Sequence, residues 1–134
     1  MTLDITSLAN AGDRLRQGLA RHLGEPSDEQ LRDGLIQRVE FTYELSHRTL
    51  KRFLKETAAA PDDIEQMSFA DLIRAANTQG LLLGDWPAWR RFREMRTRTS
   101  HTYDAAAAGQ VVAAIPGFLQ EVEHLLAALK KRLA

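Results

Sequence analysis

Cysteine is absent from the 134 residues of this sequence, which excludes disulfides, thiolate metal sites and cysteine nucleophiles together. This absence fits the reducing cytoplasm, where we expect the protein to reside. Net charge is absent as well, because 18 basic residues balance 18 acidic ones. No long-range field therefore draws the whole molecule onto nucleic acid or a membrane, and any polyanion site must be local.

Targeting signals and long apolar runs are also missing. No apolar stretch approaches the ~20 residues that span a bilayer, so we expect no membrane partner. The start, Met1 to Leu8, carries Asp4 and lacks both a basic flank and a long apolar core, unlike a signal peptide. The length is that of one domain, and residues 1–134 are expected to form a single domain around one core.

Sustained apolar-polar alternation, the mark of strands, is lacking, whereas apolar residues recur every three or four positions. The pattern predicts an all-α protein, an antiparallel bundle of about five helices. The expected elements are a helix over Ser7–Leu23 stopped by Gly24, a second from a Ser27 and Gln30 capping box to Thr57, a loop over Ala58–Asp63, a third helix from Ser68 to about Gly80, a fourth capped by Asp85, and a fifth from Asp104 to the C-terminus.

The second helix is apolar over most of its circumference. This breadth predicts cover from two directions, by its own bundle and by a second subunit, so we expect a homodimer; the central helix of a monomeric bundle is the alternative. Its broad side holds Leu31, Leu35, Val39, Tyr43, Leu50 and Phe53, widened by Phe41 and Leu45, and its polar strip holds Gln37, Glu40, Glu44, His47, Arg48 and Lys51.

Two Glu-x-x-His pairs, Glu44 with His47 and Glu121 with His124, superficially match the ligands of di-iron helical bundles. Such ligands must point inward, but helical projection turns both pairs toward solvent. The first helix also has no glutamate to contribute. We therefore expect no metal site and no cofactor.

Residues 86–104 carry the chemistry of this sequence. Five arginines against one glutamate between positions 90 and 98 give a local charge of +4, beside tryptophan, phenylalanine and tyrosine. This mixture is typical of sites that bind phosphates and stack bases. For Arg90, Arg91 and Arg98, an ordinary solvated basic face is an equal alternative.

Arg96 falls on the apolar side of the predicted helix, between Trp89 and Phe92. Desolvating an arginine without a partner is costly, so a subunit boundary or an anion-binding cleft suits it; an arginine extending from the core edge is the alternative. In an unbroken helix, His101 projects about 140 degrees away. Either the helix ends or bends between Thr97 and Thr102, or two subunits bring their copies together.

An arginine and a histidine around one phosphate suffice for RNA cleavage without a metal. Histidine moves the proton of a ribose 2′-hydroxyl or of the leaving oxygen, and arginine stabilises charge on the phosphate. In this sequence His101 and Arg96 are the candidates for these two roles.

The run from Arg96 through His101 to Tyr103 resembles the R-x4-H-x-Y motif of HEPN proteins of the HepT type, also described as nucleotidyltransferase substrate-binding proteins. Leu31–Leu45 with the following Thr49-Leu-Lys51 is similar to the long second helix of that family, and Trp89–Asp104 to its motif helix.

This resemblance implies a HEPN-like homodimeric bundle with the motif in a cleft between subunits. It implies a toxin of a toxin-antitoxin module, an RNA-cleaving enzyme acting on an RNA such as a tRNA or an mRNA, and a cognate minimal nucleotidyltransferase that silences it by attaching AMP to Tyr103. Arg96 and His101 are the implied catalytic pair. The expected substrate-binding residues are Arg93, Thr97, Arg98 and Ser100. Thr97 departs from the asparagine or other strongly polar residue usual after the arginine, which puts catalysis in question more than fold.

Two other functions compete with the toxin. One is a non-catalytic subunit that presents a substrate to the nucleotidyltransferase through the same arginine-rich cleft. The other is a purely structural interaction protein, which leaves the motif and the apolar-side Arg96 unexplained.

Overall fold

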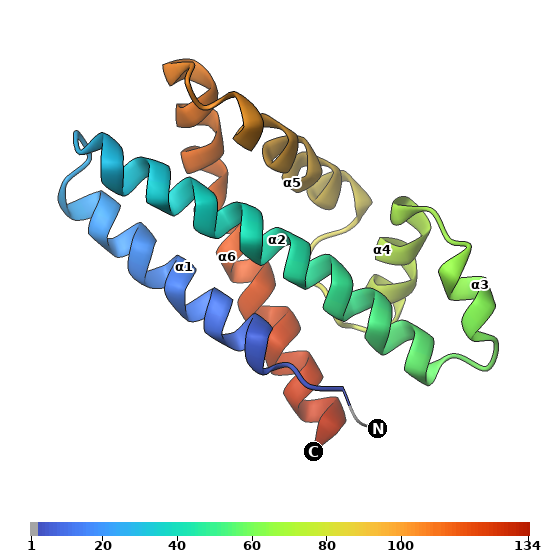
Figure 1. Ribbon diagram of the computed structural model, residues 1–134. Helices are drawn as coiled ribbons and strands as arrows, with labels where there is room; N and C mark the ends of the chain where they lie inside the picture. Colours follow the sequence, from blue (N-terminus) through green and yellow to red (C-terminus); the bar gives the residue numbers. More distant parts are fainter. Residues whose placement is uncertain (1–2) are drawn as a thin grey trace.

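The computed structural model describes residues 3–134, and within them the chain is helical and without strands (Figure 1). The all-α prediction is confirmed, but α3 lies in the segment that was expected to be a loop. Met1 and Thr2, the start of the segment judged unlike a signal peptide, lie outside the described residues. The elements are α1 (Thr6–Gly24), α2 (Glu29–Thr57), α3 (Pro61–Glu65), α4 (Phe69–Thr78), α5 (Trp86–Arg98), the 3-10 turn η1 (Thr99–His101) and α6 (Ala105–Leu133).

Short polar side chains begin four of the helices. Ser68, Asp85 and Asp104 cap α4, α5 and α6 by accepting hydrogen bonds from backbone N–H groups of the first turn, as the sequence predicted. The predicted capping box at Ser27 was wrong. Asp28 caps α2 instead and accepts from two backbone N–H groups, and its carboxylate is further favoured by the helix dipole.

The two long N-terminal helices form an antiparallel pair, and α6 crosses it from behind (Figure 1). The α5 helix lies along the other side of α2, and α3 and α4 cover the end of α2 farthest from the α1–α2 turn (Figure 1). Side chains from all the long helices meet in one core. Its fully buried members include Leu15, Val39, Ile73, Val111, Ile115, Phe118, Val122, Leu125 and Leu129.

Most of the apolar face of α2 is covered by other helices of the same chain. This helix packs against α1, α3, α4, α5 and α6, so its apolar side chains find partners without a second subunit. The breadth of this apolar face therefore does not indicate a dimer over most of α2, and the prediction was wrong in that reason. Only Phe41 remains largely outside, with 61 % of its surface exposed. The homodimer itself stays a prediction.

By length and composition α6 could cross a membrane, because 18 of its residues reach a mean hydropathy of 1.3. The statement that no apolar stretch approaches a spanning length was wrong by this measure. Within the fold, however, α6 packs on α1, α2 and α5, which is the position of a core helix.

A buried carboxylate fixes the beginning of α5. Glu121 is 4 % exposed, and its side chain accepts hydrogen bonds from the backbone N–H groups of Leu83 at 2.8 Å and Gly84 at 3.0 Å and from the indole N–H of Trp89 at 3.2 Å. The expectation that the Glu121 and His124 pair faces solvent was therefore wrong for Glu121. A Cβ on Gly84 would lie 2.8 Å from that of Ala88, so this close approach requires glycine. These contacts fix the N-terminal end of α5 against α6.

Candidate functional site

Arg96 is held by side chains of its own chain. Its Nη2 lies 2.6 Å from a carboxylate oxygen of Glu44 and 3.5 Å from one of Glu40, and its Nη1 donates to the hydroxyl of Thr99 at 3.1 Å. Only 24 % of the Arg96 side chain is exposed. Trp89 and Met95 are buried on the same helix, so packing of α5 directs Arg96 toward α2.

These contacts explain an arginine on the apolar side of α5. The anionic partners are Glu40 and Glu44, which lie one turn apart in the polar strip of α2 and were expected to be solvated. Both carboxylates remain about half exposed, so each ion pair contributes little stability, roughly 0.2–1 kcal/mol. What they supply is orientation, because two guanidinium nitrogens are fixed while other N–H groups remain for a ligand.

The predicted end of the helix between Thr97 and Thr102 is confirmed. The α5 helix stops at Arg98 and tightens into η1. Thr99 is 7 % exposed, and its hydroxyl donates to the carbonyl of Arg96 at 2.7 Å while accepting from the guanidinium. The same threonine therefore ends the helix and fixes Arg96.

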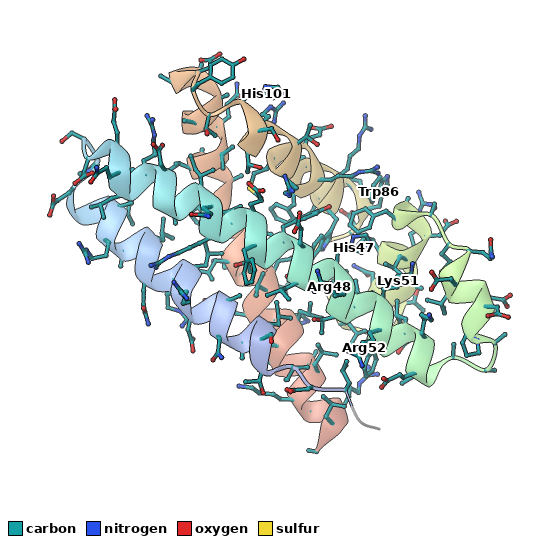
Figure 2. The ribbon with its side chains drawn as sticks, viewed as in Figure 1. His47, Arg48, Lys51, Arg52, Trp86 and His101 are labelled. Carbon is teal, nitrogen blue, oxygen red and sulfur yellow. The ribbon has the colours of Figure 1, made fainter. Side chains whose placement is uncertain are left out.

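His101 is the last residue of η1, Tyr103 follows it, and both side chains are exposed. Their ring centroids are 6.2 Å apart at 76°, and Tyr103 is 89 % exposed. Figure 2 shows His101 at the end of α5 opposite to Trp86. Ser100 and Arg98 are exposed on the same stretch. This end of the motif is thus open to another molecule.

A shallow cavity of about 350 Å³ lies between α2, α4 and α5. Of the predicted site residues, it brings together Arg93, Arg96 and Thr97, whereas Arg98, Ser100, His101 and Tyr103 are not among its lining residues. A single chain therefore does not place Arg96 and His101 in one cavity, and their meeting across two subunits stays a prediction. The remaining lining residues are Tyr43, Glu44, His47 and Phe69.

Sequence reasoning missed this cavity because its residues were assigned to other surroundings. Tyr43 was counted with the core face of α2, and His47 with its solvated strip. Phe69 comes from α4, whose placement beside α5 depends on tertiary packing. The available signal in the sequence was the four-residue spacing of Tyr43 and His47, which places both side chains on one face of α2.

Burial and nearby cations set the charge state of this cavity. Burial raises the pKa of Tyr43 to about 12, although the positive charges of Arg93 and Arg96 oppose the shift. Burial also lowers the pKa of His47, helped by the charges of Lys51 and Arg93. At neutral pH, the phenol and the imidazole are therefore both uncharged, and the arginines supply the positive charge.

Aromatic contacts hold the outer part of the cavity together. The ring of His47 meets Phe69 edge-on at 4.6 Å, and Phe69 meets Trp86 in the same manner at 5.8 Å. Arg93 lies over the ring of Phe69 at 5.7 Å from its centroid, within the range of a cation–π contact. Figure 2 shows His47 on the side of α2 that faces the beginning of α5.

Comparisons with known proteins show the family and the fold of the chain. Residues 3–131 match the family model described as nucleotidyltransferase substrate binding protein like. The chain is 46 % identical over 99 residues to a Haemophilus influenzae protein named probable ribonuclease HepT, covering 74 % of this chain and 67 % of that one. The solved structure of HI0074 from Haemophilus influenzae, described as the fold of a substrate-binding domain of a nucleotidyltransferase, superimposes with a TM-score of 0.86 at 37 % identity, over 95 % of this chain and 99 % of that one.

Proposed function

This chain belongs to the HepT-like family of nucleotidyltransferase substrate-binding proteins, and on that basis we propose that it is a metal-independent ribonuclease, the toxin of a toxin-antitoxin module. The observation that carries the proposal is the fixed Arg96 at the end of α5, followed directly by an exposed turn with His101 and Tyr103. In this proposal the protein is cytoplasmic. It acts as a homodimer, because within one chain His101 does not line the cavity that Arg96 lines.

In this mechanism His101 of one protomer and Arg96 of its partner meet at one RNA phosphate. The imidazole takes the proton of a ribose 2′-hydroxyl, whose oxygen forms a bond to the adjacent phosphorus. The bond from phosphorus to the 5′-oxygen breaks, and that oxygen takes a proton from the imidazolium formed at His101 as it leaves. The guanidinium of Arg96 stabilises the charge on the non-bridging oxygens. The products are a 2′,3′-cyclic phosphate and a 5′-hydroxyl.

The proposed partner is a minimal nucleotidyltransferase that attaches AMP to the Tyr103 hydroxyl. In that transfer the phenol oxygen bonds to the α-phosphorus of ATP and pyrophosphate leaves. The 89 % exposure of Tyr103 lets a second enzyme reach it, and its neighbour is His101. A phosphodiester at this position adds negative charge and bulk beside the imidazole, which repels an RNA phosphate.

Expression of the chain without its partner tests the proposal. We expect growth arrest, and we expect the purified protein to cleave RNA with EDTA present. His101→Ala and Arg96→Ala should abolish both effects, whereas Arg91→Ala, which removes an exposed arginine of the same helix, should abolish neither. Unchanged toxicity of His101→Ala would contradict the ribonuclease.

A second candidate function is a non-catalytic subunit that presents a substrate to the nucleotidyltransferase. The observation that favours it is the pairing of Arg96 with Glu44, which already gives the guanidinium an anionic partner. A purified dimer that binds RNA or nucleotide and leaves RNA intact would establish this function instead. Intact mass after co-expression with the partner reports whether Tyr103 carries AMP, and Tyr103→Phe is the matched control.

A further inference from the structure

The cavity between α2, α4 and α5 contains polar groups to which the proposed cleavage gives no role. Tyr43, His47 and Phe69 line it together with Glu44, Arg93, Arg96 and Thr97. Neither acid-base chemistry at His101 nor modification of Tyr103 uses the first three. These three side chains are therefore available to contact a ligand in the cavity.

Tyr43 presents an unused hydroxyl to this cavity. The residue is only 7 % exposed, and its hydroxyl makes no hydrogen bond within residues 3–134. The oxygen is nevertheless not sealed off, since His22 Nδ1 is the sole fully buried side-chain polar atom without a partner among those residues. Because this hydroxyl is reachable and has no partner within residues 3–134, it is free to donate to a ligand that accepts a hydrogen bond.

Arg93 adds a positive charge to a cavity in which the carboxylate of Glu44 is already paired with Arg96. No ion pair within 4.0 Å is made by Arg93 in the described part of the chain, whereas Arg90 pairs with Glu94 and Arg96 with Glu44 on either side of it. Its contact with the ring of Phe69 keeps the guanidinium at the cavity mouth. A free arginine beside a tyrosine hydroxyl favours an anion with several acceptor oxygens.

The size of the cavity and its aromatic side narrow the choice of anion. About 350 Å³ accommodates more than a bare phosphate and lies at the lower end of the range for small-molecule sites. Tyr43 and Arg93 supply a hydroxyl and a positive charge for a phosphate. The ring of Phe69, which contacts Tyr43, Arg93 and His47, supplies an apolar surface directly beside them. An uncharged imidazole has one donor and one acceptor for the edge of a base.

We propose that this cavity is a nucleotide subsite, in which Tyr43 and Arg93 bind a phosphate and His47 and Phe69 contact the attached base. Resting on the proposed ribonuclease function, the subsite takes the nucleotide of the RNA chain next to the one that is cleaved. Arg96 joins the subsite to the cleavage site because it belongs to both. The subsite positions RNA by binding and takes no part in bond breaking.

Binding measured without cleavage tests the subsite. In the full chain carrying His101→Ala, a fluorescein-labelled single-stranded oligoribonucleotide is titrated by anisotropy, with adenosine 5′-monophosphate and inorganic phosphate as competitors. Tyr43→Phe removes one hydroxyl and little else, and we expect it to raise the Kd for RNA about tenfold. Arg93→Gln should weaken binding about tenfold as well. Arg91→Gln, the matched loss of an exposed charge on the same helix, should change it less than about twofold.

Competition identifies the source of the nucleotide. If adenosine 5′-monophosphate displaces RNA from the parent and does so more weakly from Tyr43→Phe, a free nucleotide fits the subsite. If neither competitor displaces RNA and both variants still bind RNA more weakly, the subsite requires an RNA chain. Unchanged RNA affinity in both variants overturns the proposal. The proposal is also overturned if Tyr43→Phe is monomeric by light scattering and keeps its affinity for nucleotide. The Tyr43 hydroxyl would then serve a contact between subunits.

The failure of this proposal is separate from failure of the ribonuclease. With His101 intact, Tyr43→Phe should raise KM for an oligoribonucleotide about tenfold and leave kcat nearly unchanged, as expected for a binding group. Cleavage with an unchanged KM overturns the subsite alone. RNA binding that depends on Tyr43 and Arg93 in a protein that never cleaves RNA overturns the ribonuclease alone.

Discussion

Arg96 and His101, five positions apart in one motif, differ in almost every structural respect. The arginine is mostly buried and has hydrogen-bonding partners on two elements, Glu44 on α2 and Thr99 on η1. The histidine is exposed at the end of a short 3-10 turn, and its ring lies edge-on to that of the exposed Tyr103. The chain therefore orients one end of the motif itself and leaves the other end for a second molecule.

This difference separates a fixed electrostatic group from groups that must remain reachable. A guanidinium that stabilises charge is most effective when its orientation is set before the substrate arrives. A base that moves protons and a tyrosine that is modified by another enzyme must both be accessible. The effects of substitution should follow this division, with changes at Arg96 and its partners altering both stability and activity and changes at His101 and Tyr103 altering activity alone.

The largest expected effect is that of His101→Ala. Loss of the proton-transfer group should reduce RNA cleavage by roughly a thousandfold. The melting temperature should not change, because the side chain is exposed and supports no other residue. Cleavage rates and thermal unfolding by circular dichroism test both statements, and a large fall in melting temperature would contradict the contrast with Arg96.

The next largest effect is expected for Arg96→Lys, which retains the positive charge but loses the planar guanidinium group with its several N–H donors. A lysine cannot contact Glu44 and Thr99 in the same geometry, so we expect about a hundredfold loss of cleavage. Stability should fall by about 1 kcal/mol, since the hydroxyl and the carboxylate both lose a donor. Urea unfolding gives this value, and Arg91→Lys on the same helix is the control.

A smaller effect is expected for Glu44→Ala, which frees the guanidinium on the α2 side. Misplacement of Arg96 should reduce cleavage about tenfold. Glu44→Gln keeps an acceptor oxygen at 2.6 Å and should restore most of the rate, which a purely electrostatic role for Glu44 would not allow. Steady-state kinetics of the two variants distinguish these cases.

Thr99→Val removes only a hydroxyl. The buried threonine hydroxyl both donates to and accepts from Arg96, so its loss should cost about 1 kcal/mol of folding free energy and a few-fold in rate. Differential scanning calorimetry and the cleavage assay measure the two effects. Thr78→Val, which removes an exposed hydroxyl that donates to a backbone carbonyl within α4, should change neither.

The smallest effect concerns pH and the cavity beside Arg96. The fold lowers the pKa of His47 below its ordinary 6.5, so the unfolded chain binds a proton more readily than the folded one. This contribution to stability is present above pH 6.5 and is lost as the pH falls through the folded pKa. His47→Gln should reduce the acid sensitivity of urea unfolding slightly, because the side chain is only half buried. An unchanged pH profile would place His47 in full contact with solvent.

Much of the fold could be predicted because it depends on local chemistry. Apolar spacing gave the helical class, and Ser68, Asp85 and Asp104 cap helices through hydrogen bonds to neighbouring residues. Errors arose where a neighbouring residue competed, as at Asp28, or where the helix was too short to show a period, as in α3.

The candidate site could be predicted only in part. The residue types in the segment from Trp86 to Asp104 indicated phosphate chemistry, and the poor helix formers after Thr97 indicated the helix end that η1 provides. Helical projection could not reveal that Glu44 would face Arg96, because the rotation of α2 against α5 is set by packing. It failed at Glu121 for the same reason, since its partners lie 32 to 38 positions away.

By itself the sequence determined an all-helical chain, most of its helix ends and a segment of arginine, histidine and tyrosine suited to phosphate chemistry, because these follow from interactions within a few residues. Tertiary structure alone decided that Arg96 is held by carboxylates of α2, that Glu121 anchors the start of α5, and that Tyr43 and His47 share a cavity with Arg93. The physical reason is that helix packing fixes which faces meet, and that choice depends on the whole core at once.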